Sequence, residues 1–296
     1  MKRTVFIGCV ESSYILLECL LQNNYHVSGI ITMEHSDINA DFRSLTPLAE
    51  KYGIECICTK NVNDAKSIEF VRNIEPEIIY CFGWSRLIGK DILSIPRYGV
   101  IGFHPAALPL NRGRHPLIWA LALGLTKTAS TFFVMDEGAD TGDIISQREI
   151  RIDYTDDAKS LYNKVLEVAK DQVLEFTEWF ANGEVESNSQ NVKNGNTWRK
   201  RGKVDGQIDW RMSSEAIYNL VRALSHPYVG AHFMYGDDEV KVWRCQVEIS
   251  PEYKNIEPGK VLQVNSQSDF VVRSYDGIVR ILDCDSVDLK EGDYLR

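Results

Sequence analysis

The sequence predicts an α/β fold in which a mostly parallel sheet domain is followed by a smaller β-rich domain. Two observations predict it. In the first half, short apolar runs alternate with segments of helical periodicity, which is the rhythm of a parallel sheet with right-handed crossovers. Beyond residue 206, short alternating segments are separated by turn signals, which favour hairpins. We therefore expect domains at 1–183 and 207–296, joined by a linker at 184–206.

Five strands are predicted in the first half because their apolar runs are nearly continuous, as strands buried on both faces require. They are 4–10, 26–32, 54–59, 77–84 and 99–104. Three helices are expected between them, because each segment has apolar residues at helical spacing and opens with Ser or Asp. They are 12–24, 44–53 and 64–74.

A long amphipathic helix is predicted over 160–183, ending at Gly183, with its apolar stripe packed in the core. The Asn-, Ser- and Lys-rich stretch 184–206 then predicts an extended connection. Its basic run, Arg199 to Lys203, can either meet phosphate or form a solvated surface, and the sequence does not choose. One helix is expected over 213–227. Hairpins within 231–249 and 259–284 predict a small β-barrel or sheet.

Composition excludes several classes of protein. The chain has 296 residues, 44% of them hydrophobic, and its net charge of −9 (33 basic against 42 acidic residues) argues against a broad nucleic-acid surface. No stretch is long and apolar enough to span a membrane. Only Gly8 follows the first strand, so a dinucleotide site is not expected. The seven cysteines, including Cys56 and Cys58, lack zinc spacing. They predict reduced thiols in a cytoplasmic protein without a metal.

Polar chemistry concentrates at two strand ends. His104 is the last residue of the strand 99–104, and Asp140 lies among glycine-rich turns in the stretch 131–144. Ligands of open α/β sheets bind beyond the carboxyl ends of the strands, and a carboxylate can orient a histidine and raise its basicity. His104 and Asp140 are therefore the candidate pair. The residues alone leave Asp136, Glu137 and Asp143 as competitors of Asp140.

Three separated motifs carry a resemblance to a known family. They are Phe-His-Pro-Ala-Ala-Leu-Pro-Leu-Asn-Arg-Gly-Arg-His-Pro-Leu at 103–117, Met-Asp-Glu-Gly-Ala-Asp-Thr-Gly-Asp-Ile at 135–144, and the segment 205–233. In this order they resemble the folate-dependent formyltransferases, among them methionyl-tRNA formyltransferase and the N-formyltransferases of nucleotide-linked amino sugars. The resemblance spans most of the chain. It implies a Rossmann-like catalytic domain and a C-terminal domain that is β-barrel-like (OB-like).

The resemblance also implies the catalytic residues. The family carries an Asn-x-His near its fifth strand and an Asp in the Asp-Thr-Gly turn, and His104 and Asp140 fall on those positions. Gly102 stands where the family has its asparagine, which is thought to hold the formyl oxygen as negative charge develops. Such a donor is worth about 3 kcal/mol. We expect a backbone N–H, a water or the side chain of Asn111 to replace this donor. If nothing replaces it, activity should be reduced or lost. Gly102 itself can equally be explained by close approach of the loop or the substrate.

Two further sets of site residues follow from the resemblance. The loop after the fourth strand matches the one whose backbone groups bind the pterin ring of the co-substrate, 10-formyltetrahydrofolate. The expected co-substrate residues are Phe82, Trp84, Arg86, Leu87, Ile88, Asp136 and Gly138. From the residues alone, core packing is the preferred explanation of Trp84 and Leu87. The expected substrate residues are Asn111, Arg112, Arg114 and His115, although the charged ones can equally be loop surface.

Three functions are compatible with these residues. The first is formylation of an amino sugar on a nucleoside diphosphate, with a UDP-linked 4-amino-4,6-dideoxy sugar of a pseudaminic-acid-type pathway as the best match. The second is formylation of initiator methionyl-tRNA. The third is a non-catalytic binding protein on a degenerate scaffold, which retention of His104 and Asp140 disfavours. The net charge of −9 favours the first over the second. The oligomeric state stays open, with a homodimer as one candidate.

Overall fold

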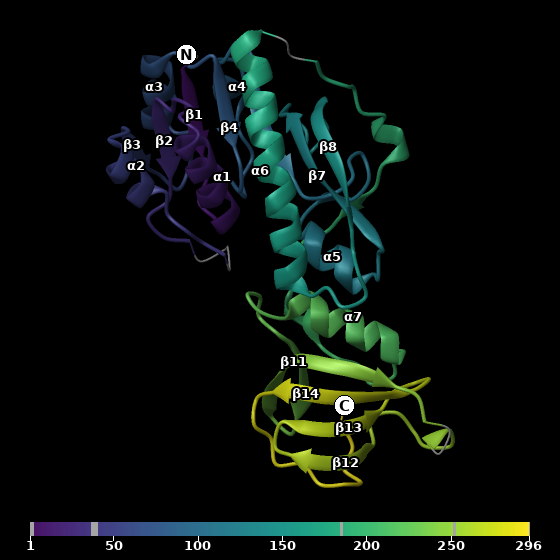
Figure 1. The fold of residues 1–296 in the computed structure, drawn as a ribbon. Coiled ribbons are helices and arrows are strands. Elements are labelled where there is room, and N and C mark those ends of the chain that lie inside the picture. Colours follow the sequence, from purple (N-terminus) through teal and green to yellow (C-terminus); the bar gives the residue numbers. More distant parts are fainter. Residues whose placement is uncertain (1–2, 37–40, 184–185, 251–252, 296) are drawn as a thin grey trace. The chain divides into compact units, whose positions relative to one another are not determined.

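A computed structural model describes residues 3–36, 41–183, 186–250 and 253–295 (Figure 1). Two compact units emerge, and each is assembled from three stretches of chain. Unit 1 comprises Met1–Pro116, Thr128–Ile150 and Asn163–Trp198. Unit 2 comprises Leu117–Lys127, Arg151–Tyr162 and Arg199–Arg296. The chain therefore passes between the units several times.

Unit 1 is built on a seven-stranded sheet with the order β3-β2-β1-β4-β5-β7-β8. The first five strands in this order are parallel, and β7 runs antiparallel to β5. The strands are β1 (Thr4–Ile7), β2 (Gly29–Thr32), β3 (Cys56–Cys58), β4 (Ile78–Cys81), β5 (Val100–His104), β7 (Lys127–Val134) and β8 (Ile144–Arg151). The predicted mostly parallel sheet is confirmed, with strands shorter than their apolar runs.

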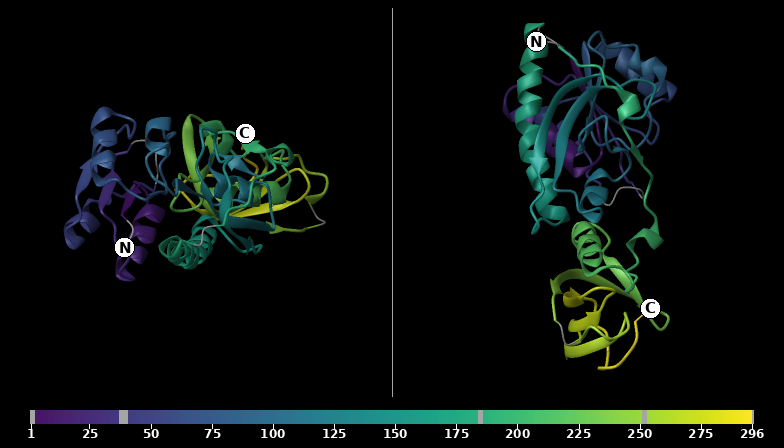
Figure 2. Two further views of the ribbon diagram at one scale, coloured as in Figure 1. Left: turned by 90° about the horizontal axis from the view of Figure 1, so that it is seen from above. Right: turned by 90° about the vertical axis from the view of Figure 1, so that its right-hand side faces the viewer.

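Helices cover both faces of this sheet because adjacent residues of each buried strand point to opposite sides. Phe6 and Tyr80 face a core formed with α1, α2 and the part of α6 that lies in unit 1. Val5 and Ile79 face the opposite core, formed with α3. The view from above shows α1 and α6 together on one side of the strands (Figure 2). The helices of these layers are α1 (Glu11–Gln22), α2 (Thr46–Tyr52), α3 (Ala65–Ile74), α4 (Lys90–Leu93) and α6 (Ala158–Asn182).

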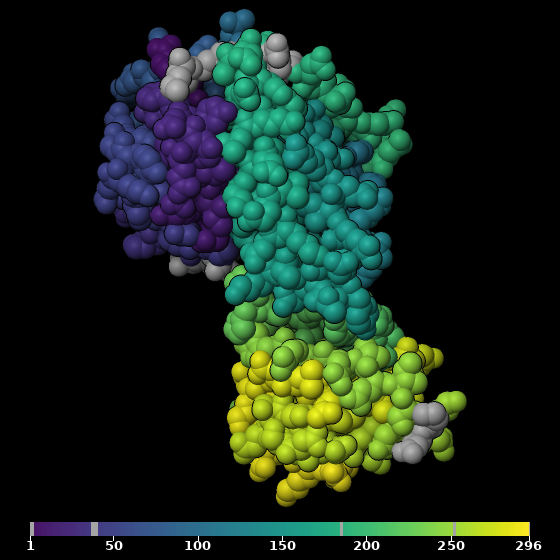
Figure 3. Space-filling view, viewed as in Figure 1, coloured from purple at the N-terminus to yellow at the C-terminus, as the bar shows by residue number. Residues whose placement is uncertain are grey.

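The long helix α6 is amphipathic, as its sequence predicts. Ala169, Val173 and Phe176 are fully buried, while Glu167, Asp171 and Glu178 on the opposite face are exposed. Figure 3 shows the solvent-facing side of α6 as a continuous teal band on unit 1. Gly183 follows the helix with φ of 80°, the left-handed conformation that commonly ends helices at glycine.

Residues 186–198 are extended, as predicted, but they are bonded to unit 1. Asn188 forms an isolated antiparallel bridge with Ile144 at the start of β8. The short strand β9 (Thr197–Trp198) pairs in parallel with β6 (Arg112–Gly113). The segment also contains a single 3₁₀ turn, η1 (Val192–Asn194). We call residues 186–198 the bracing segment, because its hydrogen bonds reach the loops described below. Residues 184–185 lie outside the described residues.

Unit 2 contains an antiparallel sheet of five strands in the order β10-β11-β14-β13-β12, confirming a β-rich C-terminal part. Helix α7 packs against β11, and Ser213 caps its N-terminus by accepting a hydrogen bond from the Ala216 N–H. The elements of this unit are α7 (Ser214–Leu224), β10 (Ala231–Tyr235), β11 (Asp238–Glu248), β12 (Val261–Ser266), β13 (Asp269–Arg273), β14 (Ile278–Cys284) and η2 (Lys203–Gly206); α5 (Pro116–Ala122) begins at the end of unit 1.

Candidate active site

His104 is the last residue of β5, at the carboxyl end of the strand where ligands of such sheets bind. Its ring is 5% exposed. Nε2 lies 2.8 Å from the carbonyl oxygen of Asn111. Because a carbonyl only accepts hydrogen bonds, Nε2 must carry the proton in this contact. Nδ1 is therefore the ring nitrogen left for chemistry.

Asp140 faces that second nitrogen. Its Oδ2 lies 3.6 Å from His104 Nδ1, within ion-pair range but too far for a direct hydrogen bond. The same oxygen accepts a hydrogen bond of 2.9 Å from the backbone N–H of Gly113. Sequence reasoning assigned Asp140 the role of orienting the imidazole. In the structure the Asn111 carbonyl holds the ring, and Asp140 stands beside its reactive nitrogen.

Two of the three competing acidic residues, Asp136 and Glu137, make other contacts. Asp136 accepts hydrogen bonds from the N–H of Gly138 and the hydroxyl of Thr141, and so shapes the turn that carries Asp140. Gly138 is required there, because a Cβ would lie 2.1 Å from Thr141 Oγ1. Glu137 is exposed and pairs with Lys90. We therefore infer that Asp136 and Gly138, expected to bind the co-substrate, act by building the turn.

Gly102 lies in β5, two residues before His104, and pairs with Phe133 of β7. A Cβ at this position would lie 2.8 Å from Phe133 Cζ and 2.9 Å from Met135 Cγ. The volume that an asparagine would need is therefore filled by these two side chains. The glycine at position 102 therefore allows the protein's own strand β7 to pack closely against β5.

The loop after β4 places its predicted residues in different environments. Phe82 is fully buried and packs between Phe6 and Phe132. Its backbone is also committed, because the carbonyl accepts from Ser13 and the N–H donates to Ile7. A direct contact of Phe82 with a ligand is therefore not supported, and the residue holds the base of the loop in the core.

Trp84 and Ile88 are buried, whereas Arg86 and Leu87 are exposed. The indole N–H of Trp84 is buried without a hydrogen-bond partner among the described residues. Asn63 bridges the end of the loop by donating to the Leu87 carbonyl and accepting from the Gly89 N–H. The loop is thus braced at its base and end. Between them it offers an unpaired donor and backbone groups.

The four expected substrate residues lie just beyond His104. Asn111 has a φ of 63°, and its side chain makes no hydrogen bond among the described residues. Arg112 is buried, with one long contact of 3.4 Å to the Val192 carbonyl and an unpaired Nε. Arg114 donates to the carbonyl of Ser85, and so links this stretch to the loop after β4. His115 also has a positive φ, of 56°.

Several residues that position this site gave no signal in the sequence. Gln190 donates to the carbonyls of Asp140 and Gly142, and the side chain of Asn196 accepts from the Asn111 N–H. Both belong to the bracing segment, whose Asn- and Ser-rich composition predicted only a connection. Gly113 gave a detectable signal, because a glycine between two arginines beside a catalytic loop indicates close backbone approach. A Cβ there would lie 2.3 Å from the Trp198 carbonyl oxygen.

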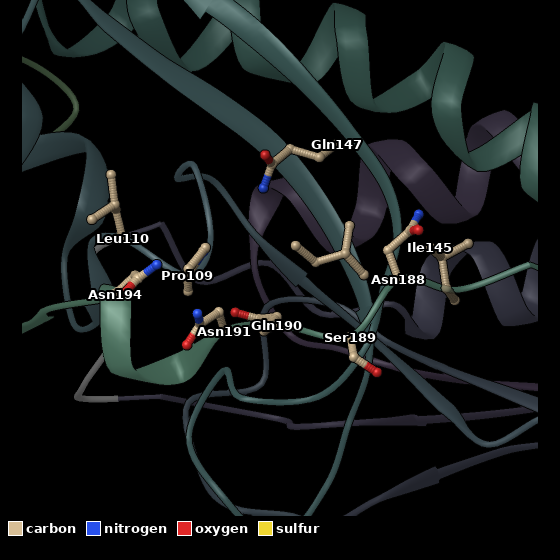
Figure 4. A pocket seen from close by; sticks show the side chains of 10 residues that line it. Pro109, Leu110, Ile145, Gln147, Asn188, Ser189, Gln190, Asn191 and Asn194 are labelled. Carbon is tan, nitrogen blue, oxygen red and sulfur yellow. The ribbon is translucent and has the colours of Figure 1, made fainter.

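A cavity of about 580 Å³ lies beside the site (Figure 4). Pro109 and Leu110 line it from the loop after β5, Gln147 from β8, and Asn188 and Gln190 from the bracing segment. None of its lining residues is charged. His104 and Asp140 are not among them, so the cavity flanks the catalytic pair without containing it.

The basic run of the predicted linker lies in unit 2, and three of its four basic residues, Arg199, Arg201 and Lys203, have partners there. Arg199 forms a double hydrogen bond with the Asp205 carboxylate, which holds the pKa of that carboxyl well below its usual range. Arg201 lies over the Trp119 ring, and Lys203 pairs with Glu239. This arrangement favours the solvated-surface interpretation of the run over an open phosphate site.

The pair is suited to moving a proton. With Nε2 bonded to the Asn111 carbonyl, His104 turns Nδ1 toward a space shared with a carboxylate, and a neutral imidazole held in this way can take a proton from a nearby nucleophile. Within the described residues, no group of three or more His, Cys, Asp or Glu side chains could hold a metal ion. The described helices likewise include none with the length and hydropathy to cross a membrane.

Comparison with known proteins identifies the family. A formyl transferase family model matches residues 17–177, and a model of the formyl transferase C-terminal domain matches residues 200–290. The methionyl-tRNA formyltransferase of Halothermothrix orenii is 30% identical over 80% of this chain and 75% of its own length. The bifunctional polymyxin resistance protein ArnA of Wigglesworthia glossinidia brevipalpis is 32% identical over 90% of this chain, which spans 40% of that protein.

Solved structures show the same fold. The N-formyltransferase from Helicobacter canadensis, in complex with folinic acid and dTDP-3-aminofucose, superposes with a TM-score of 0.72 at 18% identity. The match covers 96% of this chain and 100% of that one. The family model covers more than half of the chain, and the similarity to H. orenii spans most of both proteins. The chain therefore belongs to the formyl transferase family.

Proposed function

We propose that the protein transfers a formyl group from 10-formyltetrahydrofolate to the amine of an amino sugar linked to a nucleoside diphosphate. The observation that carries the proposal is the convergence of His104 Nδ1 and Asp140 Oδ2, 3.6 Å apart at the carboxyl edge of the sheet. Family membership supplies the reaction type. The ligands named for the H. canadensis relative support both the folate and the sugar class.

The residues divide the chemistry between them. The folate supplies an activated formyl group, and the sugar supplies a free amine as nucleophile. His104 Nδ1 takes the proton that the attacking nitrogen loses, because Nε2 is already bonded to the Asn111 carbonyl. The Asp140 carboxylate stabilises the charged imidazole, and the proton that His104 has taken then passes through Asp140 to the departing folate nitrogen. Proton handling of this kind contributes about 10²–10⁴-fold to rate.

The loop after β4 fits a flat heteroaromatic ring. Trp84 and Ile88 provide an apolar wall, and the Trp84 indole N–H is a buried donor without a partner among the described residues. Buried polar groups in native proteins are normally satisfied, so an unpaired one beside a candidate site indicates a missing ligand or water. We propose that Trp84, Arg86, Leu87 and Ile88 form the pterin side of the site.

The acceptor is proposed from charge and loop chemistry. Asn111, Arg112 and Arg114 lie on the stretch that holds His104, so they can reach the sugar and its diphosphate. A UDP-linked 4-amino-4,6-dideoxy sugar is the expected member of the class. The related H. canadensis structure holds a dTDP sugar, so both nucleotides belong in the test.

The test combines turnover with binding. Purified protein is incubated with 10-formyltetrahydrofolate and UDP-, dTDP- and GDP-linked amino sugars, and we expect a formylated product with one nucleotide series. The matching free nucleotide should raise the melting temperature, because a ligand that binds only the folded state stabilises it by RT ln(1 + [L]/Kd). Absence of product from every sugar, with folded protein and intact folate, would contradict the proposal.

Methionyl-tRNA is the second candidate acceptor, because the H. orenii relative is a methionyl-tRNA formyltransferase. A tRNA is held by many phosphate contacts, so its affinity falls steeply with salt, by close to one unit of log–log slope per phosphate. The net charge of −9 and the pairing of Arg199 and Lys203 with carboxylates of unit 2 argue against a tRNA acceptor. Tight, salt-sensitive binding of initiator tRNA, with no nucleotide effect on melting, would favour it.

A further inference from the structure

The bracing segment holds the backbone of the turn that carries Asp140. The side-chain nitrogen Nε2 of Gln190 donates one hydrogen bond of 3.1 Å to the carbonyl of Asp140 and another of 2.6 Å to the carbonyl of Gly142. These two carbonyls flank Thr141 in the Asp-Thr-Gly motif. A single carboxamide therefore ties down the turn on both sides of its tip.

The turn needs such a tie because its conformation is unfavourable. Asp140 has a φ of 58°, a region in which a side chain with a Cβ is strained by about 1–2 kcal/mol. Gly142 lies so close to β7 that a Cβ would stand 1.7 Å from the Val134 carbonyl oxygen. Strained backbone of this kind persists when its surroundings over-determine it. Without the Gln190 contacts, the two carbonyls lose the partner that fixes their direction.

Gln190 is itself placed by backbone structure. Two residues earlier Asn188 bridges Ile144, and immediately afterwards η1 begins at Val192, whose N–H bonds to the Gln190 carbonyl. The side-chain Oε1 of Gln190 is buried with no hydrogen-bond partner among the described residues. An unpaired buried oxygen costs about 1–3 kcal/mol, and a leucine or methionine would avoid that cost. A glutamine at position 190 is therefore explained by the two hydrogen bonds that its side chain donates.

The same segment holds the other half of the pair. The side chain of Asn196 accepts from the Asn111 N–H, and its carbonyl accepts from the Arg112 N–H. Asn111 is the residue whose carbonyl fixes the His104 ring. One stretch of 13 residues, 186–198, therefore fixes the backbone that positions both His104 and Asp140.

We propose that Gln190 is a positioning residue for Asp140, acting through the carbonyls of Asp140 and Gly142. The inference rests on the proposed function, because it takes Asp140 to act beside His104. Loss of the two bonds lets the carboxylate move away from His104 Nδ1. A displacement of about 1 Å in a reacting group costs up to about 10²-fold in rate. Substrate binding, which the folate loop and the arginines provide, is left in place.

The experiment compares three full-length variants with wild type. Gln190→Met keeps the length of the side chain and removes both donors, and Gln190→Glu keeps its shape while turning an acceptor toward the carbonyls. Asn191→Leu is the matched control, because this neighbouring carboxamide is exposed and makes no side-chain hydrogen bond among the described residues. For both Gln190 variants we expect kcat to fall about 10–100-fold, with KM for the folate within about threefold. Asn191→Leu should stay within about twofold of wild type.

A second measurement needs no substrate. The Gly113 N–H donates to the Asp140 carboxylate, so hydrogen exchange at this amide reports the position of the carboxylate. It should speed up in Gln190→Met and Gln190→Glu and stay unchanged in Asn191→Leu, with the melting temperature confirming that each variant is folded. Unchanged Gly113 exchange, unchanged kcat, or an equal loss in Asn191→Leu would overturn the positioning role. If the wild-type protein transfers no formyl group, the proposed function is refuted instead. Hydrogen exchange at Gly113 would still show whether Gln190 fixes the position of the Asp140 carboxylate.

Discussion

The catalytic edge of unit 1 and the sheet of unit 2 differ in how their backbones are stabilised. Near the catalytic pair, three residues other than glycine have positive φ: Asn111, His115 and Asp140. Among the described residues of unit 2, every residue with positive φ is a glycine. Such conformations cost of order 1–3 kcal/mol each in residues with a side chain. Unit 1 also has Asn24 and Glu75 with positive φ, so the contrast is between unit 2, which has no such residue in its described part, and unit 1, where three of the five lie near the proposed chemistry.

The polar contacts differ in the same way. At the catalytic edge they join side chains to backbone: His104 to the Asn111 carbonyl, Asp140 to the Gly113 N–H, and Gln190 to two carbonyls. In unit 2 many are ion pairs between side chains, such as Arg280 with Asp269. A backbone group cannot be removed by substitution, so the catalytic geometry is set by loop conformation. The ion pairs of unit 2 depend on individual side chains and on pH.

The largest effect in this comparison should come from the catalytic pair. His104→Asn and Asp140→Asn each remove a proton-carrying group that acts in the transition state, so kcat should fall about 10²–10⁴-fold with KM changed little. Steady-state rates with the accepted sugar measure this. Neither change should lower the melting temperature by more than a few degrees. Turnover at the wild-type level in either variant would remove the pair from the mechanism.

Asn111 offers the next test, because its backbone and side chain can be separated. Glycine adopts a φ of 63° without strain, so Asn111→Gly deletes the carboxamide and preserves the carbonyl that holds His104. If the carboxamide supplies the donor that the family takes from an asparagine at Gly102, kcat should fall about 10²-fold. Asn111→Ala adds backbone strain and should be worse. Equal activity of Asn111→Gly and wild type would assign the missing donor to water or backbone.

Substitution of Gly102 by asparagine should have a smaller effect, and the expected change is a loss of stability. An asparagine side chain there meets Phe133 and Met135, so Gly102→Asn alone should lower stability and leave kcat unchanged or reduced. Overpacking of this kind typically costs about 1–3 kcal/mol. Adding Met135→Ala makes room beside the new side chain, and we expect the double variant to recover the lost melting temperature. A gain in kcat in the double variant would show that the donor had been limiting.

The sequence predicted the fold well because apolar periodicity and turn residues are local signals. The continuous runs at 77–84 and 99–104 became β4 and β5, and the periodic segment 160–183 became α6. The pairing of the strands was harder to predict from the sequence. The strand β7 joins β5 in antiparallel fashion, which depends on contacts that no local pattern encodes. The strand predicted at 26–32 was too long, since only Gly29–Thr32 forms a strand of the sheet.

The candidate site was predictable where side chains carry chemistry and unpredictable where backbone does. His104 and Asp140 were predicted from their side chains, and the structure places them 3.6 Å apart. Phe82, predicted as a ligand contact, is fully buried in the structure, and an aromatic residue after a strand gives the same sequence signal in a core or a pocket. Gln190 was missed because two hydrogen bonds to carbonyls 48 to 50 residues away leave no periodicity or spacing in the sequence.

The smallest predicted effect lies in unit 2 and concerns pH. The Glu239 carboxylate pairs with Lys203 and Lys241 at 2.5 and 2.6 Å, which lowers its pKa to about 2. A carboxyl with a pKa lowered from 4.5 stabilises the folded state above about pH 4.5 and loses that contribution as pH falls toward 2. Because the site is partly open to solvent, the contribution should stay below about 1 kcal/mol.

Glu239→Gln should therefore reduce the free energy of unfolding slightly at pH 7, and the difference from wild type should vanish as pH approaches 2. His232, whose pKa is lowered mainly by burial, lies 3.9 Å from the same carboxylate and also destabilises the fold in acid. Both proteins retain His232, so the wild-type minus variant difference, measured by urea unfolding from pH 7 downward, largely isolates Glu239. High salt should shrink that difference at pH 7, because exposed ion pairs are screened. A difference that stays constant with pH and salt would show that Glu239 stabilises unit 2 by packing and not by charge.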